Sequence, residues 1–285
     1  MKIIRLFIGL LMSLFAVSCD VDRIPETALS DQSFWKSEND LKAAANYLYT
    51  LLPGMPVSDD IWSDDAFSTA SNQISDGSRL VPATDANYNS PYVMIRAANN
   101  LIEKAPLAKA NGVSQDRVNV CIGEALFFRA FAYFNLLQRY GNVPLILKTL
   151  KEDAPELSAP ANPRSEVIAS IYKDLDEAVT YLPTPTTLGN AGYGRISKTA
   201  VLSFKARAAL FEGTRSKFHA YGNPTMHLTL ALEAAKNVMD SKEHSLFASY
   251  GNLFQLAGEG RQNRENILVK QYGVSITESV LFHNS

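Results

Sequence analysis

Apolar residues recur at helical spacing between residues 123 and 140 and predict one long helix at the centre of the fold. Its bulky positions form two seams, whose members are Leu126, Ala130, Tyr133 and Leu137 in one, and Phe127, Phe131 and Phe134 in the other. A third line is small: Cys121, Ala125 and Ala132. A helix with two bulky faces and one small face packs on several sides. Ser114 is the expected N-cap, and Gly141 and Pro144 end the helix.

Similar amphipathic patterns predict five further helices, at residues 38–51, 91–105, 166–182, 198–212 and 224–242. Breakers and caps set their ends: Pro53 and Pro106 close the first two, Ser165 and Ser197 cap the next two, and Pro224 opens the last. Trp35, just before the first of these helices, is expected in the core. A short strand is predicted at residues 266–272.

Helices of this length, joined by short turns and carrying alanine at close-packing positions, favour an all-α fold of tetratricopeptide-like repeats with long irregular binding loops. The 34-residue period is irregular. The helical domain is expected to run over residues 38–245. Residues 246–285 show a weaker pattern without a stable end, so they are interpreted as the start of a truncated C-terminal ligand-binding region.

Periodicity disappears between residues 55 and 90, where Asp, Ser, Asn, Pro and Gly predominate. Structureless insertions of this length in a compact domain are usually functional or disordered, and the aromatic residues argue against simple disorder. Trp62, Asn72, Asp76 and Tyr88 offer aromatic faces, amides and carboxylates, so they are the candidate ligand-binding residues. The alternative is that Trp62 and Tyr88 only anchor the loop to the helices.

The N-terminus carries an export signal. Lys2 and Arg5 precede an apolar run, Leu6 to Val17, that is too short to span a bilayer permanently. Cys19 follows a small residue at its end, as in a bacterial lipobox, so residues 1–18 are expected to be cleaved and Cys19 to be acylated. Residues 19–37 would then be a lipidated tether and N-terminal segment. A plain secretory signal is the alternative.

The remaining chemistry is sparse. A net charge of −2 gives no reason to expect nucleic acid. Cys121 is expected to be a buried, inert thiol, and Glu124 and Arg129 to be a structural pair or to serve helix packing. The histidines lack zinc-site spacing, and an acidic group in the loop is better explained as solvated than as a cation site: Asp59, Asp60, Asp64 and Asp65. We expect no cofactor, no metal and no catalytic residue.

Taken in order, several motifs resemble the SusD/RagB family of outer-membrane nutrient-binding lipoproteins. They are the cysteine at 19, the RAANNLI segment at 96–102, the block at 123–147 with Glu124, Arg129, Tyr133 and Tyr140, the GRISK segment at 194–198, and the ENI segment at 265–267. The resemblance implies a tetratricopeptide-repeat scaffold that partners a SusC-like TonB-dependent transporter. It also implies a longer chain, with substrate held against aromatic side chains of inserted loops.

The sequence therefore predicts a surface-exposed outer-membrane lipoprotein that captures an oligosaccharide and delivers it to a transporter, without breaking a bond. Two alternatives stay open: a helical scaffold that binds only a protein partner, and capture of a non-carbohydrate nutrient such as a peptide. An exported glycosidase would need two carboxylates across one cleft, and no motif supports it.

Overall fold

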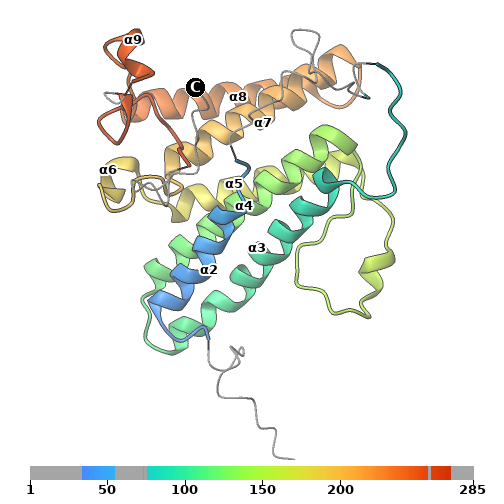
Figure 1. The fold of residues 1–285 in the computed structure, drawn as a ribbon, viewed down its shortest axis with the longest axis horizontal. Helices are drawn as coiled ribbons and strands as arrows, with labels where there is room; N and C mark the ends of the chain where they lie inside the picture. Colours follow the sequence, from blue (N-terminus) through green and yellow to red (C-terminus); the bar gives the residue numbers. More distant parts are fainter. Residues whose placement is uncertain (1–33, 55–72, 74–75, 256–257, 271–285) are drawn as a thin grey trace, which may run out of the picture. The chain divides into compact units, whose positions relative to one another are not determined.

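The computed structural model describes residues 34–54, 73, 76–255 and 258–270. In chain order its helices are α2 (Glu38–Thr50), α3 (Ala86–Ala110), α4 (Gln115–Tyr140), η3 (Pro155–Ser158), α5 (Arg164–Tyr181), α6 (Pro185–Leu188), α7 (Lys198–Phe218), α8 (Pro224–Ser241) and α9 (Tyr250–Leu253) (Figure 1). Over these residues the only strand-like pairing is an isolated bridge between Val143 and Asn162. The predicted all-α class is confirmed.

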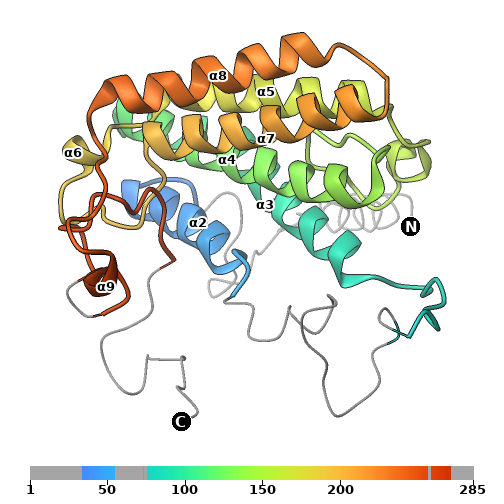
Figure 2. The same cartoon turned by 90° about the horizontal axis from the view of Figure 1, so that it is seen from above.

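The long helices stack in chain order. α2 packs against α3 and α4, α4 packs against α3 and α5, α5 contacts α7, and α7 packs along α8 (Figures 1 and 2). Neighbours in sequence are thus neighbours in space, which is how helical repeats build a continuous core. The arrangement agrees with the predicted tetratricopeptide-like scaffold.

Helix α4 lies at the centre of this stack. By length and composition it is the one described helix that could cross a membrane, but 78% of its apolar window is buried, as in a core helix. Its Phe127 and Phe134 pack edge-on against Phe204 of α7, with ring centroids 5.4 Å apart in both pairs. At Gly123 an added Cβ would lie 2.9 Å from Leu182 Cγ, so only glycine permits this approach.

Several predicted ends are confirmed. Ser114 is the N-cap of α4, and Gly141, with φ of 75°, ends it. The Ser197 side chain accepts a hydrogen bond from the Ala200 backbone N–H at the start of α7. α8 begins with proline at its first position, after the Asn223 cap. Trp35 is buried, as expected.

Helix α3 is longer than the sequence pattern indicated. We expected residues 91–105 with Pro106 closing the helix, but α3 starts at Ala86, where Asp85 caps the Asn87 backbone N–H, and it continues through Pro91 and Pro106. Each proline removes one backbone hydrogen bond, but the helix buries apolar residues between the two prolines and again at Ala108, after Pro106. Tertiary packing outweighs local propensity here. The predicted loop 55–90 therefore ends at residue 85.

Further expectations were wrong. Ser165 does not cap α5, because the helix already begins at Arg164, with Pro163 at the N-cap position.

The amphipathic pattern of residues 224–242 predicts a buried face that includes Leu228, Ala231, Leu232 and Met239. Ala231 is buried and Leu228 lies close to Gly213 of α7, but Leu232 and Met239 are 70% and 72% exposed. The predicted strand is absent between Asn266 and Lys270; its last two residues lie outside the described part of the chain.

Two of the arginine–carboxylate pairs inside the stack involve residues of α4. Arg129 of α4 donates to both oxygens of Asp174 on α5, at 2.8 and 2.7 Å, and to Asn99 Oδ1 on α3 at 2.9 Å. Glu124 of α4 accepts from Arg195 at 2.8 and 2.5 Å. Glu124 and Arg129 are structural, as expected, but each pairs with a residue far along the chain rather than with the other.

Removing one partner of such a pair leaves a buried charge uncompensated. The Arg129 and Asp174 side chains are only 9% and 4% exposed. We therefore expect Arg129→Ala to lower the free energy of unfolding by about 3–5 kcal/mol. Denaturant titration followed by far-UV circular dichroism measures this change. The matched control, Arg96→Ala on the exposed side of α3, should stay within about 0.5 kcal/mol of the parent.

The double variant Arg129→Met, Asp174→Leu separates the charge from the packing. Apolar replacements of a buried ion pair are often close to neutral, so the double variant should lose less stability than Arg129→Ala alone. A loss below about 1 kcal/mol for Arg129→Ala would contradict the assignment of a buried, mutually dependent pair.

Candidate functional site

A groove of about 770 Å³ lies where the 55–85 segment leaves and rejoins the helices, and we call it the loop-side groove. Pro53 and Gly54 line one side, and Ala86, Asn87 and Pro91 of α3 line another. α4 and α7 complete it through Phe131, Ala132, Phe134, Asn135, Gln138, Arg139, Phe204 and Arg207. The groove is thus lined by residues that precede and follow, in the sequence, the segment predicted to bind ligand.

The chemistry of this groove suits a sugar. Phe131 and Phe204 are half-buried, with ring centroids 5.5 Å apart and planes tilted by 42°. Among the residues that the structure describes, the side chains of Asn135, Gln138 and Arg207 have no hydrogen-bond partner. Sugars present C–H faces to aromatic rings and hydroxyls to amide and charged groups. The groove therefore combines an apolar surface with unused polar groups.

Tyr88 lies beside this groove, in the first turn of α3 rather than in a loop. Its ring packs against Tyr92 and Tyr140, with centroids 5.2 and 5.1 Å apart. The Tyr140 hydroxyl in turn donates to Asp85 Oδ2 at 2.8 Å. This contact set fits the anchoring alternative, although Tyr88 stays partly exposed. Ligand binding by Tyr88 stays a prediction.

The other candidate residues are less informative. Asp76 is exposed, and its Oδ1 accepts from the Ser78 backbone N–H at 2.9 Å, so its carboxylate shapes a turn. Trp62, Asn72 and the acidic group at 59–65 lie outside the described residues, and so does Cys19. Of the four candidates the structure describes only Asp76 and Tyr88, and the binding role of all four stays a prediction.

Sequence reasoning missed the groove residues on α4 and α7. Phe131 was expected in a core seam, but it is only partly buried and lines the groove. Asn135 and Gln138 were passed over, although two amides three residues apart on an otherwise apolar helix were the available signal. Their spacing places both side chains on one face.

A smaller hollow of about 330 Å³ lies between residues 185–197 and 243–269. Arginines line this hollow, but they donate hydrogen bonds to backbone carbonyls of the protein itself. Arg261 donates to the Pro185 carbonyl at 3.2 Å, and Arg264 donates to the Glu243 carbonyl at 3.1 Å. These contacts pin the last described segment against α6 and the end of α8. We assign this hollow a structural role.

The comparison with known proteins defines the class. A family model described as starch-binding and associating with the outer membrane, the SusD-like family, matches residues 26–210. Because this match covers more than half of the chain, the protein belongs to the SusD-like family. The predicted resemblance is confirmed.

Individual relatives agree. SusD-like protein P38 of Formosa agariphila is 25% identical over 87% of this chain and 48% of its own length. A SusD-like protein of Bacteroides ovatus is 28% identical over 95% of this chain and 50% of its own. The chain thus spans about half the length of the curated relatives it matches.

Solved structures show the same fold. A SusD-like carbohydrate-binding protein from Bacteroides fragilis superposes with a TM-score of 0.66 at 22% identity, over 83% of this chain and 46% of that one. A laminarin-binding SusD-like protein gives 0.64 at 19% identity, over 82% and 51%.

Cys121 is not built as a nucleophile. It is 8% exposed, and burial raises the pKa of its thiol to about 12. A thiol with a raised pKa is almost fully protonated at neutral pH and reacts slowly. No cluster of His, Cys, Asp and Glu suited to a metal occurs among the described residues.

This burial predicts the reactivity of the thiol. In protein carrying Cys19→Ser, Cys121 should resist a disulfide reagent such as dithionitrobenzoate at pH 8 in the folded state. It should react fully in denaturant, since unfolding returns the pKa toward about 8.5. Absorbance of the released thiolate follows the reaction. Fast labelling of the folded protein at pH 8 would contradict a buried, protonated thiol.

Proposed function

We propose that this protein is a cell-surface lipoprotein that captures an oligosaccharide and delivers it to a SusC-like TonB-dependent transporter. The observation that supports it most is the loop-side groove, in which half-buried phenylalanine rings lie next to amides without partners. The mechanism is binding and release; no bond in the sugar is broken. Membership of a starch-binding family supports the choice of a glycan.

The groove and the 55–85 segment would act together. Asn135 and Gln138 stand on α4, a helix buried on several sides, so their backbone is held in place. Ligand-binding groups on a rigid element lose little freedom on binding, which favours affinity. Trp62, Asn72, Asp76 and Tyr88 would add contacts from the segment and the start of α3.

Anchoring would come from acyl chains on Cys19. Each buried methylene contributes about 0.8 kcal/mol, so two or three chains hold a protein on a bilayer. The segment at 19–37 would keep the helical scaffold at the membrane surface, within reach of a transporter. The family's association with the outer membrane supports this localisation.

Glycan capture is tested with the full-length product of the gene, lacking residues 1–18 and carrying Cys19→Ser. A glycan array should identify at least one bound oligosaccharide. The double variant Asn135→Ala, Gln138→Ala should weaken its binding about tenfold or more, since two hydrogen bonds of about 1 kcal/mol each are lost. Isothermal titration calorimetry measures the change.

The controls separate groove, loop and scaffold. Asn237→Ala, an exposed amide on α8 that does not line the groove, should leave affinity unchanged. Loss of affinity in Trp62→Ala or Tyr88→Ala would add those rings to the site. No binding to any glycan would refute glycan capture and favour a protein-only scaffold or a nutrient such as a peptide.

Lipidation predicts where the protein is found. Full-length protein should partition with outer membranes, take up radiolabelled palmitate and be digested by protease added to intact cells. Cys19→Ser should abolish the label and shift the protein to a soluble fraction, because its acyl chains are lost. Membrane retention of Cys19→Ser without label would instead support a plain secretory signal and another mode of attachment.

A further inference from the structure

A second and larger groove, of about 1010 Å³, lies between α5 and the start of α8, and we call it the α5–α8 groove. The end of α7 and the connection at 219–223 close one end of it. It shares no lining residue with the loop-side groove. Its volume is at the upper end of the about 300–1,000 Å³ that ligand pockets occupy.

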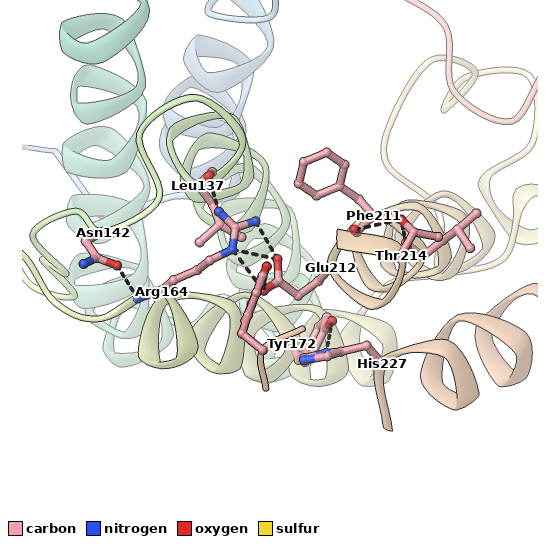
Figure 3. Close-up of polar contacts among 10 residues, drawn as sticks. Leu137, Asn142, Arg164, Tyr172, Phe211, Glu212, Thr214 and His227 are labelled. Atoms are coloured by element: carbon pink, nitrogen blue, oxygen red, sulfur yellow. Dashed lines mark hydrogen bonds and ion pairs between the residues drawn. The ribbon is translucent and has the colours of Figure 1, made fainter. Parts of the chain in front are cut away.

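The floor of this groove is preformed (Figure 3). The Tyr172 hydroxyl and His227 Nδ1 are 2.9 Å apart, and these residues are only 8% and 6% exposed. Burial lowers the pKa of His227, so the ring is neutral near pH 7, and its Nδ1 shares a hydrogen bond with the tyrosine hydroxyl. Both polar atoms are thereby satisfied, and the accessible apolar surface of the lining comes from residues such as Met226, which is 45% exposed.

The carboxylate at the end of the groove is also occupied. Glu212 of α7 accepts from Arg164 Nε and Nη2 at distances from 2.5 to 3.0 Å, and from the Tyr221 hydroxyl at 3.1 Å. The backbone N–H of Arg164 donates to Asn142 and its Nη1 to the Leu137 carbonyl, so the guanidinium is fixed (Figure 3). This end therefore has few free groups for the hydroxyls of a sugar.

The rim carries positive charge without compensation. Lys173 of α5 and Arg215 of α7 are exposed and line the groove, and neither forms an ion pair with a described residue. The exposed lining carboxylate, Asp176, is 2.5 Å from Lys205 and so is already paired. The surrounding walls are apolar, with Ile168 and Leu230 on facing helices.

We propose that the α5–α8 groove is the docking site for a polypeptide segment of a partner protein, one that carries apolar side chains flanked by acidic residues. Apolar side chains would pack on Met226 and Leu230, beside the buried Tyr172 and His227, and carboxylates would meet Lys173 and Arg215. Helix-in-groove recognition uses this combination of buried apolar anchors and complementary charges. Because the proposed function includes a protein partner, this inference rests on it and names the partner's chemistry.

The two grooves thus differ in what they leave unsatisfied. In the loop-side groove the amides of Asn135 and Gln138 are unpaired, which suits sugar hydroxyls. In the α5–α8 groove the Tyr172 hydroxyl and His227 Nδ1 are paired with each other, and the rim carries Lys173 and Arg215, which form no ion pair with a described residue. A sugar would leave most of its hydroxyls unpaired there, at a cost for each buried polar group.

Cross-linking tests the proposal. Benzophenone-maleimide is attached to an Ala169→Cys variant of the full-length product, on the rim of α5 and one turn from Lys173, in the Cys19→Ser background. The labelled protein is irradiated with solubilised outer-membrane proteins of the same cells, and cross-linked peptides are sequenced by mass spectrometry. We expect one recurrent stretch of another protein, rich in apolar residues and containing at least two Asp or Glu.

Charge reversal gives the control. The double variant Lys173→Glu, Arg215→Glu should reduce the yield of that cross-link about tenfold, because the introduced carboxylates would repel the acidic residues of the partner. A matched pair of exposed lysines away from the groove, changed as Lys109→Glu, Lys236→Glu, should leave it unchanged. Glycan titration of both variants should match the parent, so loss of glycan capture and loss of docking are separate results.

Four outcomes would overturn the proposal. They are no recurrent cross-link, a cross-link only to another part of this chain or to a second copy, a cross-linked stretch without acidic residues, and equal yields for the groove variant and its control. The first three leave the glycan result standing, and the last removes the role of the rim charges.

Discussion

Burying a charge inside a helix stack is tolerated only when its partner is held in place, and three arginines impose this condition here. Arg129 meets Asp174 between α4 and α5, Arg164 meets Glu212 between α5 and α7, and Arg195 meets Glu124 of α4. Each pair is bidentate, which fixes orientation as well as distance. The relative rotation of neighbouring helices is thereby set more narrowly than apolar packing alone requires.

Both grooves depend on the relative orientation of the helices that these ion pairs fix. Arg164 and Glu212 form the closed end of the α5–α8 groove, while the loop-side groove lies between α4 and α7. In the proposed sugar-capturing lipoprotein, the two grooves suit different ligands. The loop-side groove places unpaired amides beside aromatic rings, which suits the hydroxyls of a sugar. The α5–α8 groove places cations beside apolar side chains, which suits a polypeptide with acidic residues. A single rigid stack then holds cargo and partner on separate sets of side chains.

Local chemistry made much of this fold predictable. The starts of α7 and α8 follow from the Ser197 side-chain cap and from the geometry of Pro224, which act over a few residues, and α4 begins after Ser114 as expected. The sequence failed where distant parts of the chain decide: α3 continues through Pro106, and α8 leaves the apolar side chains of Leu232 and Met239 exposed.

The ion pairs and the loop-side groove were harder still to predict from the sequence. The partners of Glu124 and Arg129 lie 71 and 45 residues away, and periodicity carries no information over such separations. The sequence shows that Asn135 and Gln138 are amides on a core helix. It does not show that they line a groove, because this depends on how far α7 covers α4. The candidates in the 55–85 segment followed from composition alone.

The placement of the buried pairs bears on how the stack comes apart. In a solenoid held by apolar faces, end repeats can fray while the rest stays folded. Here α7 carries the carboxylate for an arginine on α5, and α5 carries the carboxylate for an arginine on α4. If one helix unfolds locally, the charged side chain that it paired on the neighbouring helix stays partly buried without a partner. Local unfolding of each helix therefore carries an additional free-energy cost. Such a chain of dependence makes unfolding more cooperative than its repeat architecture alone implies.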